Sequence, residues 1–273
     1  MTHLDSLEAQ SIYLLREAYH TFPRLCMLWS MGKDSNVLLW LTKKAFGGHI
    51  PYPLLHIDTT YEFPEMLEFR TWAQQFYQFD LTIKVNEEAR TGRGAYQTAI
   101  GYETHDPVTV THELKTVALQ QFMTEHFFDG LITGIRRDED ATRAKERYFS
   151  PRTSDFEWSY KDQPPEFWNQ FVSRGKPGEH MRIQPLLDWT EVDIWRYIAR
   201  EQIPIPSLYF AREGKRYRSL GCWPITKPIE SSASTIPEIV EELLQTKHSE
   251  RAGRAQDHHE RNAMQKLRAK GFL

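Results

Sequence analysis

Short apolar runs alternate with amphipathic segments along most of this chain. Five runs have the length and composition of buried strands: residues 25–29, 53–58, 81–85, 130–134 and 181–186. Between them, apolar residues recur at helical spacing in residues 4–20, 37–46, 64–78 and 114–122. Strands that alternate with helices predict an α/β fold with a doubly wound, mainly parallel sheet, here of five strands. The fifth run is rather polar, so we expect it at an edge of the sheet.

Capping residues indicate where several of the predicted helices begin and end. Gly47 and Gly48 follow one helix directly, and a glycine with positive φ commonly ends a helix. Thr190 and Asp193 have the spacing of a capping box. Thr235 is followed by a proline and a glutamate at the positions that favour a helix start.

Two prolines suggest a boundary in the last third of the chain. Pro204 and Pro206 interrupt regular structure after the helix that the capping box opens. We therefore expect a main domain over residues 1–205 and a C-terminal extension over residues 206–273. Residues 247–270 of that extension are basic and poor in aromatic side chains, which makes them too polar for a core.

The first apolar run leads into a polar turn and then a helix. The turn, residues 30–35, reads SMGKDS. A strand, a glycine-containing turn and a helix start together direct backbone N–H groups and the helix dipole towards a phosphate. Lys33 adds a cation, and Gly32 allows a close backbone approach. Asp34 would repel a phosphate, so we expect it to cap the helix, to hold the loop or to bind Mg²⁺. The alternative for the whole turn is that it binds no phosphate and its Ser and Asp residues only cap the helix.

The second apolar run ends in a carboxylate, Asp58, followed by Thr59 and Thr60. Open parallel sheets bind their ligands at the carboxyl ends of the strands. Asp58 at such an end orients Mg²⁺ or a ribose hydroxyl, or else caps the helix that follows. Both interpretations are open from the sequence alone.

A basic cluster follows the fourth apolar run. Arg136 and Arg137 come directly after the strand, where guanidinium groups can clamp an oxyanion with two hydrogen bonds each. Residues 143–147, RAKER, add three cations. A solvated helix with ion pairs from the acids at 138–139 to Arg143 also explains this second group.

Two other polar segments carry weaker signals. Residues 86–107 lack a clear periodicity and contain several glycines, so we expect a loop near the site. Residues 111–116, THELKT, contain possible ligands, but a solvated surface helix explains most of them.

Composition restricts the class of protein. The 273 residues include 34 Lys and Arg against 37 Asp and Glu, a net charge of −3, which provides no general attraction to nucleic acid or to an anionic membrane. No apolar run approaches the roughly 18–20 residues of a membrane helix, and the N-terminus does not resemble a signal peptide. Two distant cysteines, Cys26 and Cys222, favour neither a disulfide scaffold nor a thiolate metal site. We expect a soluble cytoplasmic protein.

Six motifs, in order, connect the chain to a known family. They are SMGKDS, LLHIDT, GIRRDE, RAKER, PLLDWTEVDIW and LGCWPIT. The first resembles the pyrophosphate-binding loop of the N-type ATP pyrophosphatases, S-x-G-x-D-S, and its lysine resembles the sulfate-assimilation branch. Together the six resemble the small catalytic subunits of bacterial sulfate adenylyltransferase, which are related to phosphoadenylyl-sulfate reductase. The resemblance extends over nearly the whole chain and implies an adenine nucleotide alpha hydrolase-like fold.

The resemblance also implies an activity and a partner. ATP and sulfate would give adenylyl sulfate and pyrophosphate, with Mg²⁺ bridging the phosphates, and a large GTPase subunit would drive this uphill reaction in a heterodimer. The expected catalytic residues are Lys33, Arg136 and Arg137. The expected nucleotide-binding residues are Ser30, Gly32, Asp34, Ser35, Leu55, Ile57, Asp58, Gly134, Arg143, Lys145 and Arg147, with the backbone of Leu55 and Ile57 reading adenine. No protein residue is expected to form a dedicated metal site.

Two features depart from the family pattern. The family often carries a longer insertion between residues 208–209 and the RYRSLGCWP stretch, where this chain has only a few residues. Asn36 and Trp40 also differ from the expected helix after the loop. Both departures concern partner contacts rather than the chemistry.

Three alternatives remain from the sequence. The first is a related enzyme on the same loop, such as a thiolation enzyme. The second is the reductase, which uses a cysteine near its C-terminus; the last 50 residues of this chain contain none. The third is a nucleotide-binding regulatory subunit without turnover. Because the implied GTPase must contact this chain, we also expect residues 236–273 to dock on it, the alternative being a solvated tail.

Overall fold

The computed structural model describes residues 1–159, 161, 163–166, 170–171, 178–246 and 250. Its helices are α1 (His3–Thr21), α2 (Lys33–Ala45), α3 (Pro64–Tyr77), α4 (Glu87–Thr91), α5 (Pro107–Thr111), α6 (Ala118–His126), α7 (Glu191–Glu201) and α8 (Ile236–Gln245). Its strands are β1 (Leu25–Leu28), β2 (Leu54–Ile57), β3 (Leu81–Lys84), β4 (Gly130–Ile132), β5 (Phe149–Arg152), β6 (His180–Ile183), β7 (Lys215–Arg216) and β8 (Ile229–Glu230). A π-helical segment, η1 (His112–Val117), joins α5 to α6, and two 3₁₀ turns are η2 (Ala141–Lys145) and η3 (Ser207–Tyr209).

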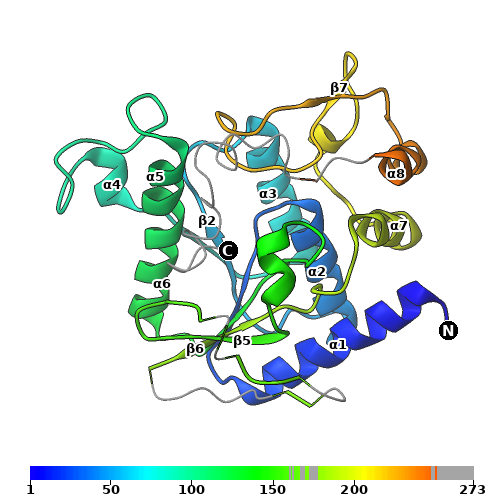
Figure 1. Ribbon diagram of the computed structural model, residues 1–273, viewed down its shortest axis with the longest axis horizontal. Helices are drawn as coiled ribbons and strands as arrows, with labels where there is room; N and C mark the ends of the chain where they lie inside the picture. The colour runs from blue at the N-terminus through cyan, green and yellow to red at the C-terminus, as the bar shows by residue number, and fades with distance from the viewer. Residues whose placement is uncertain (160, 162, 167–169, 172–177, 247–249, 251–273) are drawn as a thin grey trace.

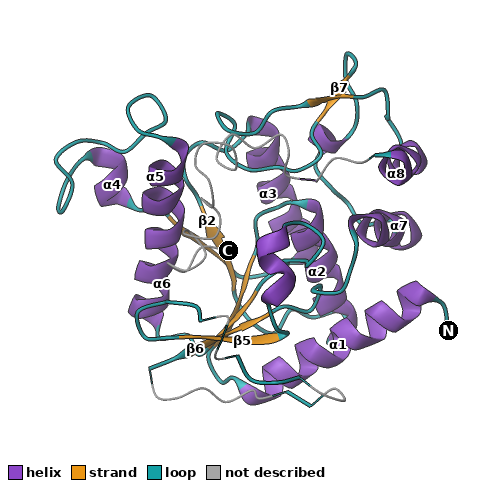
Figure 2. Ribbon diagram, in the orientation of Figure 1, coloured by secondary structure: helices purple, strands orange, loops and turns teal. Residues whose placement is uncertain are grey.

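The main sheet is mainly parallel, and helices cover both of its faces (Figures 1 and 2). Its strand order is β3-β2-β1-β4-β6-β5, and only β5 runs antiparallel to its neighbour. The chain leaves β1 towards β2 and β3, and then returns to place β4 on the other side of β1. This reversal between β1 and β4 is the point where doubly wound sheets bind ligands. The predicted fold class is confirmed.

The sequence-based count of five strands and the edge position of the fifth are both wrong. The sheet has six strands, and the one that the sequence analysis missed is β5, which forms the edge. The strand predicted as the fifth is β6, which lies between β4 and β5. A buried polar network explains why this part of the sheet is less apolar: Arg152 pairs with Glu146 at 3.0 Å, and Gln184 donates to Glu146 at 2.8 Å. Because the carboxylate of Glu146 accepts from both Arg152 and Gln184, these polar side chains are tolerated beside the sheet.

Two apolar clusters hold the helices against the sheet. Alternate residues of β1 point to opposite faces: Met27 packs with α1, α2 and α7, whereas Cys26 packs with α6. At the parallel register of β1 and β4, a Cβ on Gly130 would lie 2.8 Å from Cδ1 of Leu25, so any larger residue there would force the Leu25 side chain to shift. The sheet edge that carries the loop after β1 is thus held rigidly from both faces.

The predicted helix ends are confirmed. Gly47 and Gly48 have φ of +63° and +99° directly after α2. The side chain of Thr190 accepts from the backbone N–H of Asp193 in a capping box at the start of α7, and Thr235 does the same for α8. Residues 86–107, which we expected to be a loop near the site, contain the short helix α4 and do not line the main pocket. Among the described residues, no helix is long and apolar enough to cross a membrane.

Candidate active site

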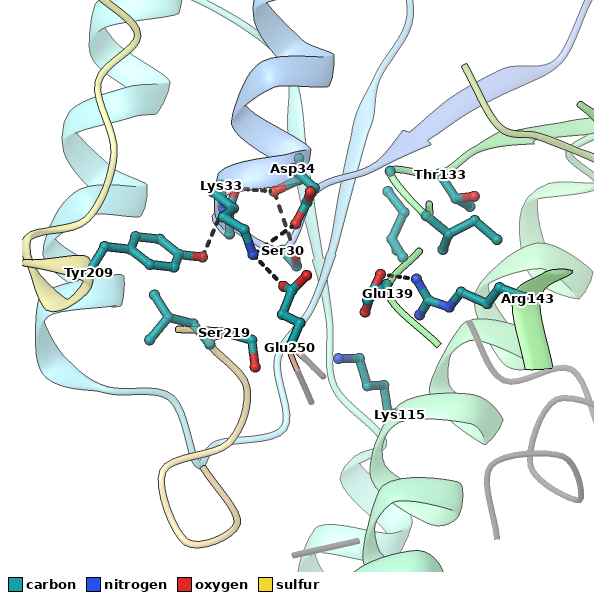
Figure 3. Close-up of a pocket in the computed structure, with 16 residues that line it drawn as sticks. Ser30, Lys33, Asp34, Lys115, Thr133, Glu139, Arg143, Tyr209, Ser219 and Glu250 are labelled. Atoms are coloured by element: carbon teal, nitrogen blue, oxygen red, sulfur yellow. Dashed lines mark hydrogen bonds and ion pairs between the residues drawn. The ribbon is translucent and has the colours of Figure 1, made fainter. Parts of the chain in front are cut away.

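A pocket opens at the carboxyl ends of β1 and β4, where the sheet reverses direction (Figure 3). Its free volume is about 130 Å³. The loop after β1, the loop after β4, the segment η1 and the segments around residues 209, 219–220 and 250 surround it. Its lining residues are Leu28, Ser30, Gly32, Lys33, Asp34, Ser35, Lys115, Thr133, Gly134, Ile135, Glu139, Arg143, Tyr209, Ser219, Leu220 and Glu250.

The SMGKDS loop has a strained and well-braced backbone. Met31 has φ of +61°, which is uncommon for a residue with a side chain. Asn36 stabilises this turn: its amide donates to the carbonyl of Met31 at 2.8 Å and accepts from the indole of Trp29 at 3.0 Å. The hydroxyl of Ser35 donates to the carbonyl of Gly32 at 2.9 Å. Asn36, which the sequence showed only as a departure from the family, therefore shapes the loop.

Lys33 begins α2 and is buried beneath the pocket, with 1% of its side chain exposed. Its ammonium group pairs with Glu250 and lies 3.5 Å from Asp34 (Figure 3). Burial opposes the charged form, but the carboxylates of Asp34, Glu250 and Glu191 outweigh it and raise the pKa of Lys33. Its backbone N–H donates to the hydroxyl of Tyr209 at 2.8 Å. Lys33 is therefore a permanent cation at the helix N-terminus.

Arg136 is fully buried and contacts carboxylates on three sides. Its Nε donates to Asp34 at 2.6 Å, one terminal nitrogen donates to Asp138 at 2.5 Å, and the other pairs with Glu250. Burial alone would lower the pKa of Arg136, but these carboxylates hold it well above its usual value. Asp34 thus holds the loop by joining it to Arg136, one of the roles expected for it.

Glu250 lies between the two cations, and sequence reasoning missed it. Its carboxylate contacts both Lys33 and Arg136. Burial would raise the pKa of Glu250, but the charges of Lys33 and Arg136 lower it strongly. A carboxylate thus occupies the point where these cations converge, and an incoming oxyanion would compete for the same two groups. No local pattern could have indicated this, because Glu250 is 217 residues from Lys33.

Among the basic residues after β4, Arg143 lines the pocket, whereas Arg136 lies fully buried behind the lining. Arg143 pairs with Glu139, as the spacing predicted. Arg137 does not line the pocket; it pairs with Asp188 and lies over the ring of Tyr148 at 5.6 Å. The side chains of two further predicted residues, Lys145 and Arg147, also lie outside the lining, the first exposed and the second half-buried. Gly134 lines the pocket against the loop backbone.

The residues predicted on β2 lie apart from the main pocket. Asp58 pairs with Arg70 at 2.9 Å and accepts from the backbone N–H of Thr60 at 2.8 Å, so it joins α3 to the strand end. Leu55 is buried in the cluster under α6. Ile57 lines a second, smaller pocket that shares Leu28, Ser30, Lys115 and Leu220 with the main one.

Lys115 is a second residue that the sequence analysis missed, because THELKT was interpreted as a surface helix. It lies on the π-helical segment η1 and points into the pocket (Figure 3). The extra residue of a π-helical turn re-aims side chains and is frequent at functional sites. Lys115 lines both pockets, so a ligand that occupies both would lie beside its ammonium group.

Among the described residues, no group of three or more histidines, cysteines, aspartates or glutamates is arranged to hold a metal ion. The two oxygens of Asp34 already face Arg136 and Lys33, and both oxygens of Glu250 face the same two cations. A Mg²⁺ ion at this pocket would therefore need ligands from its substrate.

Comparisons with known proteins agree with this geometry. Residues 24–228 match the phosphoadenosine phosphosulfate reductase domain. The whole chain is similar to sulfate adenylyltransferase subunit 2 of Colwellia psychrerythraea, with 41% identity over 303 aligned positions and 99% of that relative covered. The Brucella abortus protein of the same name is 42% identical over 304 positions, with 100% of this chain and 99% of the relative covered.

Two solved structures share the fold. Phosphoadenylyl-sulfate reductase from Candida auris superposes with a TM-score of 0.56 at 20% identity, over 82% of this chain and 96% of that one. FMN adenylyltransferase from Candida glabrata superposes with a TM-score of 0.54 at 17% identity, over 90% and 72%.

Proposed function

Because this chain belongs to the sulfate adenylyltransferase subunit 2 family, which carries the phosphoadenosine phosphosulfate reductase domain, we propose that it transfers the adenylyl group of ATP to sulfate. The products would be adenylyl sulfate and pyrophosphate. The observation that supports this most is that Lys33, in the lining of the pocket at the reversal of the sheet, and the buried Arg136 behind that lining converge on the carboxylate of Glu250. That arrangement would neutralise a chain of phosphates.

The chemistry needs charge neutralisation more than proton transfer. A sulfate oxygen attacks the α-phosphorus of ATP and forms a new P–O bond, while the bond to the β-phosphate oxygen breaks and pyrophosphate leaves. Sulfate is already ionised, so no general base is required. Such in-line transfers are accelerated by positioning and by fixed positive charge.

The residues of the pocket suggest the following roles. The loop residues Ser30, Gly32 and Ser35 would hold the β- and γ-phosphates with hydroxyl and backbone N–H groups at the start of α2. Lys33 and Arg136 would neutralise the leaving pyrophosphate once Glu250 moves away. The second group of cations, Lys115 and Arg143, faces the pocket from η1 and from the segment after β4, where sulfate and the α-phosphate would lie. Asp34 would position the loop. Direct roles for Asp58, Arg137, Lys145 and Arg147 stay predictions.

A Mg²⁺ ion would enter with ATP. Mg²⁺ in such sites keeps several waters and takes its other ligands mainly from substrate phosphates, which suits a pocket whose carboxylates are engaged with cations. Its contribution would be to neutralise phosphate charge.

The reductase alternative is disfavoured by the state of the cysteines. Cys26 and Cys222 are both buried, and burial raises the pKa of each thiol. A nucleophilic cysteine needs the opposite, an accessible thiol with a lowered pKa.

Pyrophosphate exchange tests the proposed function. The protein, with its partner subunit where this is required, should incorporate labelled pyrophosphate into ATP only when sulfate is present. Exchange without any dependence on sulfate would indicate another acceptor, and no exchange under either condition would favour a regulatory nucleotide-binding subunit.

We also propose a partner, a large GTPase subunit that couples GTP hydrolysis to this reaction in a heterodimer. The name of the relatives, subunit 2, is consistent with a second subunit. Residues 206–273 would form an extension beyond the nucleotide-binding domain of residues 1–205, and residues 236–273 would dock on the partner. Within that segment the structure describes α8 and Glu250; residues 247–249 and 251–273 lie outside the described residues.

Deleting residues 252–273 is expected to weaken co-purification with the large subunit, because this basic segment, poor in aromatic residues, belongs to the proposed docking region. Pull-down of a tagged large subunit with full-length and shortened chains measures the effect. If the shortened chain binds at full affinity and GTP still drives adenylyl sulfate synthesis, the segment is not the docking element.

Replacing Glu250 by glutamine is expected to lower stability and to tighten anion binding. Loss of one member of a buried ion-pair network costs on the order of 3 kcal/mol when the partner charges remain. Because the pKa of Glu250 is lowered in the fold, its ion pairs contribute fully at neutral pH and are lost only as strong acid protonates the carboxylate.

Thermal unfolding with and without pyrophosphate measures both effects. The Glu250→Gln variant should unfold at a lower temperature, and pyrophosphate should raise its unfolding temperature by more than it raises that of the unmodified protein. An equal shift in both proteins would mean that Glu250 does not compete with anions.

A further inference from the structure

His56 is a buried histidine that the proposed chemistry does not use. It lies in β2 with 2% of its surface exposed and lines the second pocket. Its neighbours in the strand, Leu55 and Ile57, pack under α6, so alternation along β2 turns His56 towards the opposite face. There it lies near Glu62 and Met66 of the same pocket.

Its hydrogen bonding fixes which ring nitrogen carries the proton. The Nδ1 atom lies 3.2 Å from the carbonyl oxygen of Trp29. A carbonyl oxygen only accepts, so Nδ1 is the donor. Burial, reinforced by the charge of Arg70, lowers the pKa of His56 to about 4, so the ring is neutral near pH 7. In that tautomer Nε2 carries a lone pair and no hydrogen, and it can only accept.

No described residue donates a hydrogen bond to this acceptor. The Nε2 atom is buried, and the described part of the chain supplies it with no partner. A buried polar atom without a partner is costly, and such atoms are rare enough to need an explanation. Because His56 itself lines a pocket, a ligand in that pocket can supply the missing donor.

We propose that Nε2 of His56 accepts a hydrogen bond from the exocyclic amino group of adenine and thereby selects ATP among purine nucleotides. This inference rests on the proposed function, since it names the base that the same site recognises. Adenine presents a donor at position 6, whereas guanine and hypoxanthine present a carbonyl oxygen there. An oxygen facing Nε2 would place two acceptors together and leave both without a proton, which a buried site rejects strongly.

The positions of the two pockets fit one nucleotide. The second pocket has a free volume of about 20 Å³ against about 130 Å³ for the main pocket, so it admits the edge of a base rather than a whole ring. Ser30 belongs to both pockets and to the phosphate-facing loop. A nucleotide with its phosphates at the start of α2 would therefore place the edge of its base against His56.

The expected discrimination is measurable with ATP and inosine triphosphate, which differ in the group at position 6. By calorimetry, the unmodified protein should bind ATP at least roughly 10-fold more tightly than inosine triphosphate. The His56→Leu variant should bind ATP more weakly and inosine triphosphate about as before, so the ratio should fall close to one. Purine riboside triphosphate, which has no group at position 6, should bind both proteins with similar affinity.

His180 is the matched control. It is also buried, its Nε2 also has no described partner, and burial lowers its pKa to about 3, but it lines neither pocket. The His180→Leu variant should keep the unmodified ratio of ATP to inosine triphosphate affinity. Comparing the two variants separates an effect on base selection from the loss of stability that removal of any buried imidazole causes.

The inference is overturned if His56→Leu keeps the full preference for ATP, or if it weakens ATP and inosine triphosphate equally. Pyrophosphate exchange by the unmodified protein distinguishes failure of this inference from failure of the proposed function. If exchange depends on sulfate but the His56→Leu variant keeps the unmodified ratio of ATP to inosine triphosphate affinity, adenylyl transfer stands and His56 is only a structural residue.

Discussion

Replacing Lys33 by alanine is expected to lower adenylyl transfer at least ~100-fold, the usual scale for losing one preorganised electrostatic contact. Lys33 lies at the N-terminus of α2, inside the pocket, and its charge is maintained by surrounding carboxylates. In the proposed reaction one further negative charge develops on the leaving pyrophosphate as its bond to the α-phosphorus breaks. Without Lys33, the loop would offer only neutral donors to that charge.

The fold should survive this substitution, because the Glu250 carboxylate keeps Arg136 as a partner. Circular dichroism and thermal unfolding check the fold, and sulfate-dependent pyrophosphate exchange measures the loss. Lys44 provides a matched control: it lies near the other end of α2 and pairs with Glu8 and Glu201. The Lys44→Ala variant should retain activity within a few-fold. Near-normal exchange by a folded Lys33→Ala variant would remove Lys33 from the reaction.

Replacing Arg136 by lysine is expected to cause a loss of turnover of similar size, on the order of 100-fold, although the charge is conserved. Each of three guanidinium nitrogens of Arg136 contacts a different carboxylate, those of Asp34, Asp138 and Glu250. A lysine ammonium is a compact point charge and cannot reproduce this planar arrangement. Asp34 would lose its anchor, and the SMGKDS loop would lose its position relative to β4.

Steady-state adenylyl sulfate synthesis should show this loss mainly in kcat, with sulfate-dependent exchange as a second assay. Arg216 is a suitable control, because it is equally buried and pairs with Glu242 at 2.6 Å, but its hydrogen-bond partners lie outside the SMGKDS loop. Its lysine variant should keep turnover while losing some stability. Full activity of the Arg136→Lys variant would mean that only local positive charge matters. The same substitution at Arg137 tests whether its predicted catalytic role exists.

The loop and its framework could be predicted from the sequence because they depend on neighbouring residues. A helix cap involves residues three positions apart, as in Thr190 and Asp193, and strand or helix periodicity extends over only a few more. The order of strands and helices then placed the segments around Ser30 and Arg136 at one sheet edge. The family resemblance added the activity, which no periodicity could supply.

Only the tertiary structure decided which side chains contact the SMGKDS loop. Arg136 and Arg137 are adjacent and chemically identical, yet Arg136 is buried against Asp34 of the loop and Arg137 pairs with Asp188. Their partners come from segments far apart in the sequence, so no local pattern distinguishes the two arginines. The same applies to Lys115, whose direction depends on the π-helical turn of η1.

The sequence by itself determined the doubly wound α/β class, the strand–turn–helix unit around the SMGKDS loop and the ends of the principal helices. The tertiary structure alone brought Tyr209 and Glu250 to Lys33, across 176 and 217 residues. It also placed His56 in the lining of a second pocket and left its Nε2 without a partner among the described residues. Local sequence patterns indicate which secondary structure each segment prefers. Burial, charge pairing and the state of a titratable group depend on which distant segments pack against it, so these properties arise only when the chain has folded.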